Sequence, residues 1–220
     1  MNLIILNKSF GNFKNTKESI FYNLKDNQGL EEIKKIIIKN TPNNIISIDF
    51  GIQTNKYISN NTIIIGKESI LINSKPVDWS IPRADRWSET SERLNHKISN
   101  LLEENCLAHE IASCAQLEYT ENIKKREKAI EWIYKNIKVS FIDDNSAELL
   151  KIIFEMKLSD KFTFIRLINN NYQLSNNKKD NLLKKIIDYL YAKIFTKYHM
   201  KKTFSEIYDK KIITKLSVID

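Results

Sequence analysis

The chain has 220 residues and a formal net charge of +8 at neutral pH, and 42% of its residues are hydrophobic and 10% aromatic. This apolar content supports a packed core and excludes intrinsic disorder as the main state. The positive charge, most of which falls after residue 175, favours an anionic partner without requiring one.

No window reaches the roughly 18 consecutive apolar residues of a membrane span, and the first residues do not form a signal peptide. Cys106 and Cys114 are eight residues apart, which on a helix is about 12 Å and too far for a disulfide. We therefore expect reduced thiols in a cytoplasmic protein without a membrane span.

Glycine and proline occur only in the first 82 residues. This change in composition predicts two domains, 1–82 and 83–220, because both residue types mark turns. We expect an α+β protein, with a small mixed sheet and one or two helices in the first domain and a predominantly helical second domain.

In the first domain, β-branched runs predict strands at 2–6 and 45–50, and the pattern over 17–40 predicts a helix broken near Gly29. Gly66-Lys67-Glu68 separates two further apolar runs, 62–65 and 69–72, which predicts a hairpin. A connector with two prolines then leads into the second domain.

In the second domain, residues 87–138 predict either one long helix or two helices joined near 120–122. A short strand at 138–142 and a helix at 147–158 follow, and 162–168 is compatible with either strand or helix. Amphipathic patterns predict basic helices over 178–200 and 203–220.

The long helical segment carries residues spaced alternately by four and three, which is the pattern of a helix packed lengthwise on another helix. These residues are Leu94, Ile98, Leu101, Asn105, Ala108, Ala112, Ala115 and Tyr119. The pattern predicts a coiled-coil seam, which pairs either within the chain or with a second protein or a second copy.

Lysines interleaved with tyrosines near the C-terminus predict an anion-binding face for nucleic acid or an acidic protein, with a solvated helix face as the alternative. The lysines are Lys178, Lys179, Lys184, Lys185, Lys193, Lys197, Lys201 and Lys202.

Four carboxylates are the candidates for catalysis. Asp49 ends an apolar run, and Asp143 and Asp144 begin a helix after another, where capping is the alternative role. The segment 111–150 is similar to the middle of PIN-type ribonucleases, and this resemblance places Glu118 at that family's second acid. Converging acids of this kind would hold divalent metal for phosphodiester hydrolysis.

Complete catalytic signatures are missing: there is no glycine-rich phosphate loop, and Ser113 stands where a zinc helix would need its second histidine after His109. We therefore predict no resident metal and no cofactor. The leading hypothesis is a non-enzymatic interaction or assembly protein that works through the seam and the basic face. The alternative is a metal-dependent nuclease or nucleic-acid-binding protein that uses some of the four carboxylates.

Overall fold

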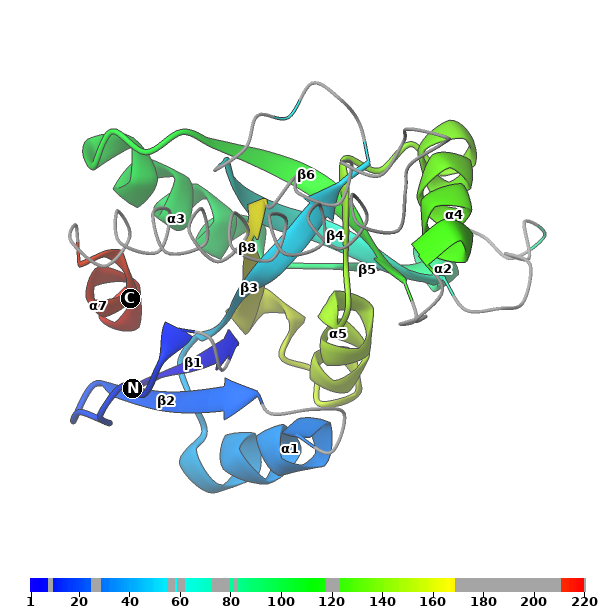
Figure 1. Cartoon of the computed structure of the whole chain (residues 1–220). Helices are drawn as coiled ribbons and strands as arrows, with labels where there is room; N and C mark the ends of the chain where they lie inside the picture. The colour runs from blue at the N-terminus through cyan, green and yellow to red at the C-terminus, as the bar shows by residue number, and fades with distance from the viewer. Residues whose placement is uncertain are drawn as a thin grey trace, which may run out of the picture.

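The computed structural model describes residues 1–7, 10–24, 29–54, 58, 62–72, 80, 83–117, 123–168 and 211–219. The strands are β1 (Asn2–Asn7), β2 (Ser19–Leu24), β3 (Ile45–Gln53), β4 (Ile63–Ile72), β5 (Trp87–Glu89), β6 (His109–Leu117), β7 (Phe141–Asp143) and β8 (Phe162–Ile168). The helices are α1 (Gly29–Asn40), α2 (Arg83–Arg86), α3 (Glu92–Glu104), α4 (Ile123–Asn136), α5 (Ser146–Glu155), the 3-10 turn η2 (Ser159–Lys161) and α7 (Ile212–Ser217), as Figure 1 shows.

The eight described strands pair in one mixed sheet, and part of this sheet closes on itself. β3 pairs in parallel with β8, β8 runs antiparallel to β4, and β4 runs parallel to β6. β6 is parallel to β7, which returns antiparallel to β3 and closes the ring. These five strands form a small mixed barrel, which β1 and β2 extend on one side and β5 on the other.

Apolar side chains pack on both faces of β1, β3 and β8, because successive residues of a strand point to opposite faces. On one face they pack with residues of α1 and α5, namely Ile33, Ile37, Leu149, Leu150 and Ile153. On the other face they pack with residues of α3 and α7, namely Ile98, Leu102, Ile212, Ile213 and Leu216. Helices therefore cover both faces of this part of the sheet.

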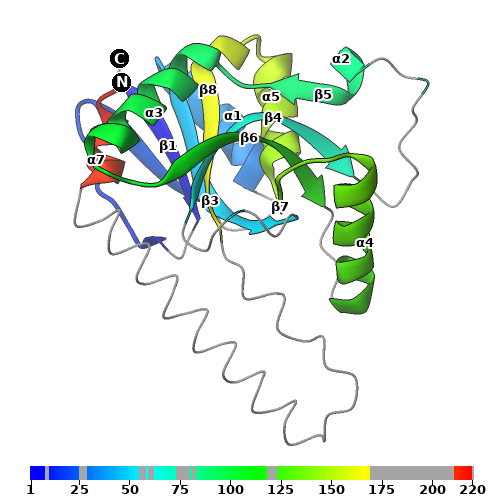
Figure 2. The ribbon, with the colours of Figure 1, turned by 90° about the horizontal axis from the view of Figure 1, so that it is seen from above.

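A third, smaller core packs against α4, which lies beyond the end of β6 in Figure 2. Ile133 of α4 is fully buried there against Ala115 of β6 and Ile142 of β7. No helix in the described part of the chain is long and apolar enough to cross a membrane.

The prediction of an α+β protein with a predominantly helical C-terminal region is wrong. Four strands of the sheet, β5 to β8, come from residues beyond 82, and they alternate with helices. One sheet thus draws strands from both of the predicted domains. The segment 162–168, which was ambiguous by pattern, is the central strand β8, and it is buried along its whole length.

The coiled-coil prediction is also wrong, because the predicted seam changes from helix to strand part of the way along. Leu94, Ile98 and Leu101 lie on α3, which Asn105 caps at its C-terminal end. Cys106 then adopts φ +52°, a left-handed backbone conformation that ends the helix. Beyond it, Ala112 and Ala115 lie in β6, between β4 and β7.

Two predictions in the N-terminal part need correction. The first half of the helix predicted over 17–40 is the edge strand β2, whereas the second half is helical as predicted, in α1. The predicted hairpin is one continuous strand, β4, with a bulge between Gly66 and Glu68. A Cβ atom at Gly66 would overlap the ring of Phe164, so this glycine permits close packing and not a turn.

Candidate functional site

The carboxylate of Asp49 is held by two asparagine amides that come from different elements. Asn7, the last residue of β1, donates from Nδ2 to Oδ1 of Asp49 at 2.7 Å, and the backbone N–H of Phe50 donates to the same oxygen at 2.7 Å. Asn145, at the start of α5, donates from Nδ2 to Oδ2 at 2.7 Å. Both oxygens of a carboxylate that is only 9% exposed are thus fixed in orientation.

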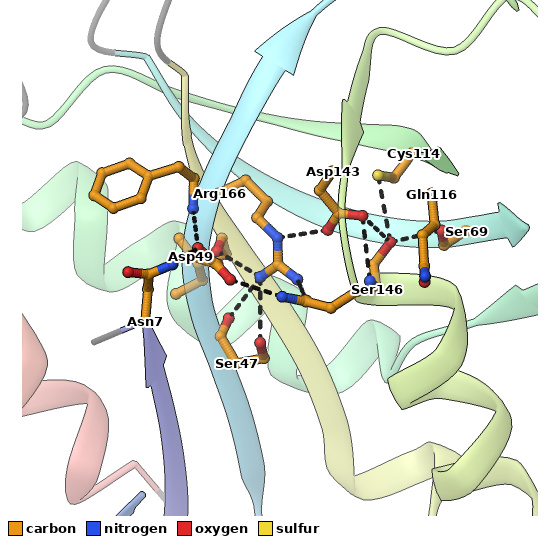
Figure 3. Close-up of polar contacts among 12 residues, drawn as sticks. Asn7, Ser47, Asp49, Ser69, Cys114, Gln116, Asp143, Ser146 and Arg166 are labelled. Atoms are coloured by element: carbon orange, nitrogen blue, oxygen red, sulfur yellow. Dashed lines mark hydrogen bonds and ion pairs between the residues drawn. The ribbon is translucent and has the colours of Figure 1, made fainter. Parts of the chain in front are cut away.

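A buried ion pair lies directly beside this clamp. Arg166, opposite Asp49 in the β3–β8 pairing, donates from Nε to Oδ2 of Asp143 at 2.6 Å, and both side chains are almost fully buried. Its Nη2 donates to Oδ1 of Asn145 at 2.7 Å. Asn145 therefore links Asp49 to the ion pair. Figure 3 shows Arg166 between Asp49 and Asp143.

The remaining donor nitrogen of the Arg166 guanidinium, Nη1, also finds hydrogen-bond acceptors on the barrel strands. Nη1 of Arg166 donates to the backbone carbonyl of Ile165 at 3.0 Å and to the carbonyl and hydroxyl oxygens of Ser47 at 3.3 Å. Burial of a charge is tolerated when a counter-ion and further hydrogen bonds surround it. We refer to Asn7, Asp49, Asp143, Asn145 and Arg166 as the Asp49 cluster.

The N-terminus of α5 is anchored to the same cluster. Oδ1 of Asp143 accepts hydrogen bonds from the backbone N–H and the hydroxyl of Ser146, at 3.2 and 2.7 Å. The side-chain carbonyl of Gln116, at the end of β6, accepts from the backbone N–H of Glu148 at 2.8 Å. Two of the free N–H groups of the first turn are therefore capped by buried side chains.

A thiol lies behind this turn. Cys114 is fully buried 3.5 Å from the hydroxyl of Ser146, which also lies 2.7 Å from that of Ser69. Burial, followed by the negative charge of Asp143, raises the pKa of the Cys114 thiol well above its ordinary value. This cysteine is thus held in the neutral form, and its role here is in packing.

The structure brings together two of the four predicted carboxylates, Asp49 and Asp143. Asp49 and Asp143 both contact Asn145 or Arg166, and Asp144 is the next residue in the chain, with an exposed side chain. Glu118 lies outside the described residues. Among the residues that are described, no three His, Cys, Asp or Glu side chains gather in a way that could hold a metal ion.

The other predicted sites are separated by the fold. The seam residues divide between α3 and β6, Ala108 precedes β6, and Tyr119 lies outside the described part. All eight lysines of the predicted anion-binding face also lie outside it, so that face stays a prediction. His109 begins β6, whereas Cys106 is in the turn before it.

Sequence reasoning missed Asn7, Asn145 and Arg166, which orient the predicted carboxylates. One signal was available for Arg166, because it is the only charged residue in the apolar strand 162–168. A charge in a buried strand requires a carboxylate partner nearby. The asparagines gave no such signal, because asparagine is abundant throughout this chain.

The fold is similar to that of known nucleosidases, although no protein-family model and no curated protein sequence matches the chain. A Helicobacter pylori 5′-methylthioadenosine/S-adenosylhomocysteine nucleosidase matches with a TM-score of 0.69 at 14% identity, covering 98% of this chain and 97% of that one. An H. pylori futalosine hydrolase mutant matches with a TM-score of 0.63 at 14% identity, covering 95% and 99%. The Campylobacter jejuni 5′-methylthioadenosine/S-adenosylhomocysteine nucleosidase gives 0.59 at 11% identity, covering 92% and 98%.

These comparisons correct the functional predictions. The assembly-protein hypothesis depended on a continuous helical seam, but the chain has the fold of nucleosidases, and Ala112 and Ala115 of that seam lie in the strand β6. The nuclease hypothesis depended on acids that share metal ions. Asp49 is instead held by amides, and Asp143 is held by an arginine.

Proposed function

We propose that this chain is a nucleoside hydrolase-like enzyme that binds a nucleoside beside the Asp49 cluster and cleaves the bond between its base and its sugar with water. The proposal is supported by two observations together. The fold is that of nucleosidases over nearly the whole of both chains, and a preorganised polar cluster lies where β1 and β7 end and α5 begins.

The cluster has the chemistry that a nucleoside requires. The sugar hydroxyls and the exocyclic amine of a nucleoside are hydrogen-bond donors, and carboxylates are the strongest acceptors among side chains. Asp144, an exposed carboxylate that lies in the chain between Asp143 and Asn145 of the cluster, is the one proposed to contact substrate. The hydrogen bond from Asn145 to Asp49 fixes the orientation of the neighbouring cluster.

The proposed reaction is the hydrolysis of an N-glycosidic bond. The oxygen of water bonds to C1′ of the sugar, and the bond from C1′ to the base nitrogen breaks with its electron pair on the base. Asp144 accepts a proton from the attacking water, and the leaving base gains one from solvent. A carboxylate that flanks the scissile bond is the usual general base in hydrolysis of this kind.

The test is release of free base, measured by chromatography, from methylthioadenosine, S-adenosylhomocysteine and futalosine. We expect release from at least one of them, and a loss of at least about 100-fold in the Asp144→Asn variant. Asp160→Asn is the matched control, because Asp160 is an exposed aspartate of η2, just before β8 begins.

Binding is measured separately by calorimetry with the same three nucleosides. Binding without base release would overturn the hydrolytic step and leave a nucleoside-binding protein. If none of the three compounds binds or is cleaved, the proposed function is wrong.

A further inference from the structure

A serine and a histidine are paired on the face of the sheet that α3 covers. The hydroxyl of Ser99, on α3, lies 2.7 Å from Nε2 of His109, the first residue of β6. Ser99 is partly exposed, and the side chain of His109 is 10% exposed. The pair is therefore held by packing but remains accessible at the serine.

The other ring nitrogen determines which group donates. Nδ1 of His109 lies 3.0 Å from the backbone carbonyl oxygen of Leu107, which can only accept a hydrogen bond. In the neutral ring the proton therefore lies on Nδ1, and Nε2 carries the lone pair. The hydroxyl of Ser99 then donates to Nε2, which is the arrangement of a nucleophile with its general base.

A carboxylate completes the group. Oε1 of Glu103 lies 3.9 Å from Nε2 of His109, and Glu103 is one helical turn beyond Ser99 on the same face of α3. A nucleophile, an oriented base and a nearby carboxylate thus come together from α3 and β6.

We propose that Ser99 is a catalytic nucleophile for acyl transfer from small activated esters, with His109 as its general base. Oγ of Ser99 attacks the ester carbonyl carbon while its proton passes to Nε2, and the bond to the leaving alcohol breaks with its electron pair on that oxygen. The leaving oxygen takes the proton back from Nε2. Water then hydrolyses the acyl-serine by the same route and restores the hydroxyl.

This activity is independent of the proposed nucleoside site. Ile98 and Leu102 of α3 pack on the opposite face of the sheet from Leu149 and Ile153 of α5, which begins at the Asp49 cluster. A failure of one proposal therefore leaves the other standing.

The test uses p-nitrophenyl acetate, with p-nitrophenolate release followed by absorbance and the acetylated residue located by mass spectrometry. The exposed thiol of Cys106 would also react with the ester, so every measurement uses the Cys106→Ser background. We expect one acetyl group on Ser99, and loss of the acetylation in Ser99→Ala. His109→Gln should acylate at least about 100-fold more slowly.

The matched control is His96→Gln. His96 also lies on α3 and is 3.7 Å from a carboxylate, that of Glu92, but its side chain is 68% exposed. We expect this variant to acylate at the rate of its parent. The proposal is overturned if Ser99→Ala releases p-nitrophenolate as fast as its parent, or if the acetyl group is found only on lysines.

Discussion

The guanidinium of Arg166 and the carboxylate of Asp143 form an ion pair in the interior of the barrel, with Nε 2.6 Å from Oδ2 and both side chains at most 1% exposed. Neither charge has access to bulk water, so each depends on the other for solvation. The pair also joins two parts of the structure, because Asp143 caps α5 and Arg166 orients the side-chain amide of Asn145.

The first prediction concerns this pair. Arg166→Met removes the counter-ion and leaves a buried carboxylate, so we expect the free energy of unfolding to fall by about 3–5 kcal/mol in urea titrations. The double variant Arg166→Met with Asp143→Asn removes both charges, and its amide oxygen can still accept from Ser146. We expect it to be more stable than Arg166→Met alone. Equal stability of the single variant and the wild type would contradict this view of the pair.

The candidate site could be predicted only in part, and the reason lies in its two kinds of residue. Asp49 and Asp143 were predictable because carboxylates at the ends of apolar runs are rare and chemically conspicuous. Asn7 and Asn145 were not, because their role depends on the pairing of β1, β3 and β7 in space. The position of the site in the sequence was visible, but its geometry was not.

The fold was mispredicted where small residues fit both the spacing of a helix and the alternation of a strand. Ala112 and Ala115 continue the helical spacing of Ile98, yet they lie in β6, a strand with a neighbour on each side. Alanine fits a crowded strand as easily as a helix, and a strand covered on both faces shows no clear alternation. The helix ends without a glycine, and Asn105, which caps it, fitted the seam spacing and was therefore read as part of the helix.

The second prediction concerns Gly66. A Cβ atom there would overlap the Phe164 ring, which is fully buried and cannot move aside, so Gly66→Ala should destabilise the fold by at least about 1–3 kcal/mol. Gly51→Ala is the control, because its new Cβ would come no closer than 3.2 Å to a neighbouring atom. We expect a smaller loss for Gly51→Ala.

Truncation of the ring tests whether the overlap is the cause. In a Phe164→Leu background the atoms that the new methyl group meets are gone, so Gly66→Ala should cost less there than in the wild type. Urea unfolding of the four proteins in this cycle gives the coupling energy directly. A cost that is the same in both backgrounds would show that backbone conformation, and not the ring, requires the glycine.

The third prediction concerns the two thiols. Cys106 is exposed and Cys114 is fully buried, and burial raises the pKa of the Cys114 thiol. A disulfide reagent at mildly alkaline pH should therefore modify one thiol per folded chain rapidly and the second only after unfolding. Cys106→Ser should abolish the rapid phase. A rapid phase that persists in this variant would mean that Cys114 is accessible.

The raised pKa of Cys114 also determines whether stability rises or falls with pH. The pKa of Cys114 is higher in the folded chain than in the unfolded chain, where it is about 8.5. The neutral Cys114 thiol therefore makes its full contribution to the free energy of unfolding below that pH. This contribution is lost as the pH rises above it. The loss of stability between pH 8 and pH 10 should be smaller in Cys114→Ala than in the wild type, as thermal unfolding across this range would show.

The fourth prediction concerns the attachment of α7. Asn2, in β1, donates from Nδ2 to the backbone carbonyls of Ser217 and Ile219, at 3.0 and 2.7 Å, and thus satisfies the C-terminal end of that helix. Asn2→Ala removes this donor, which is only 5% exposed, while the Ser19 hydroxyl still donates to the carbonyl of Ser217 at 3.1 Å and Nδ2 of Asn44 to that of Ile219 at 2.9 Å. We expect a loss of about 0.5–1.5 kcal/mol in the free energy of unfolding, the net contribution of a hydrogen bond whose acceptors keep other donors. Faster amide hydrogen exchange within residues 212–217 should accompany it.

Asn136→Ala is the matched control, because its amide also donates to a backbone carbonyl, that of Trp132, but on an exposed helix face. Water can replace that donor, so its removal should change stability by less than about 0.5 kcal/mol. Asn2→Asp should be worse than Asn2→Ala, since it turns a carboxylate oxygen toward the two carbonyls. If Asn2→Ala and Asn136→Ala are equally stable, the amide of Asn2 does not hold α7. The donors Ser19 and Asn44, together with the apolar residues of the helix, then suffice.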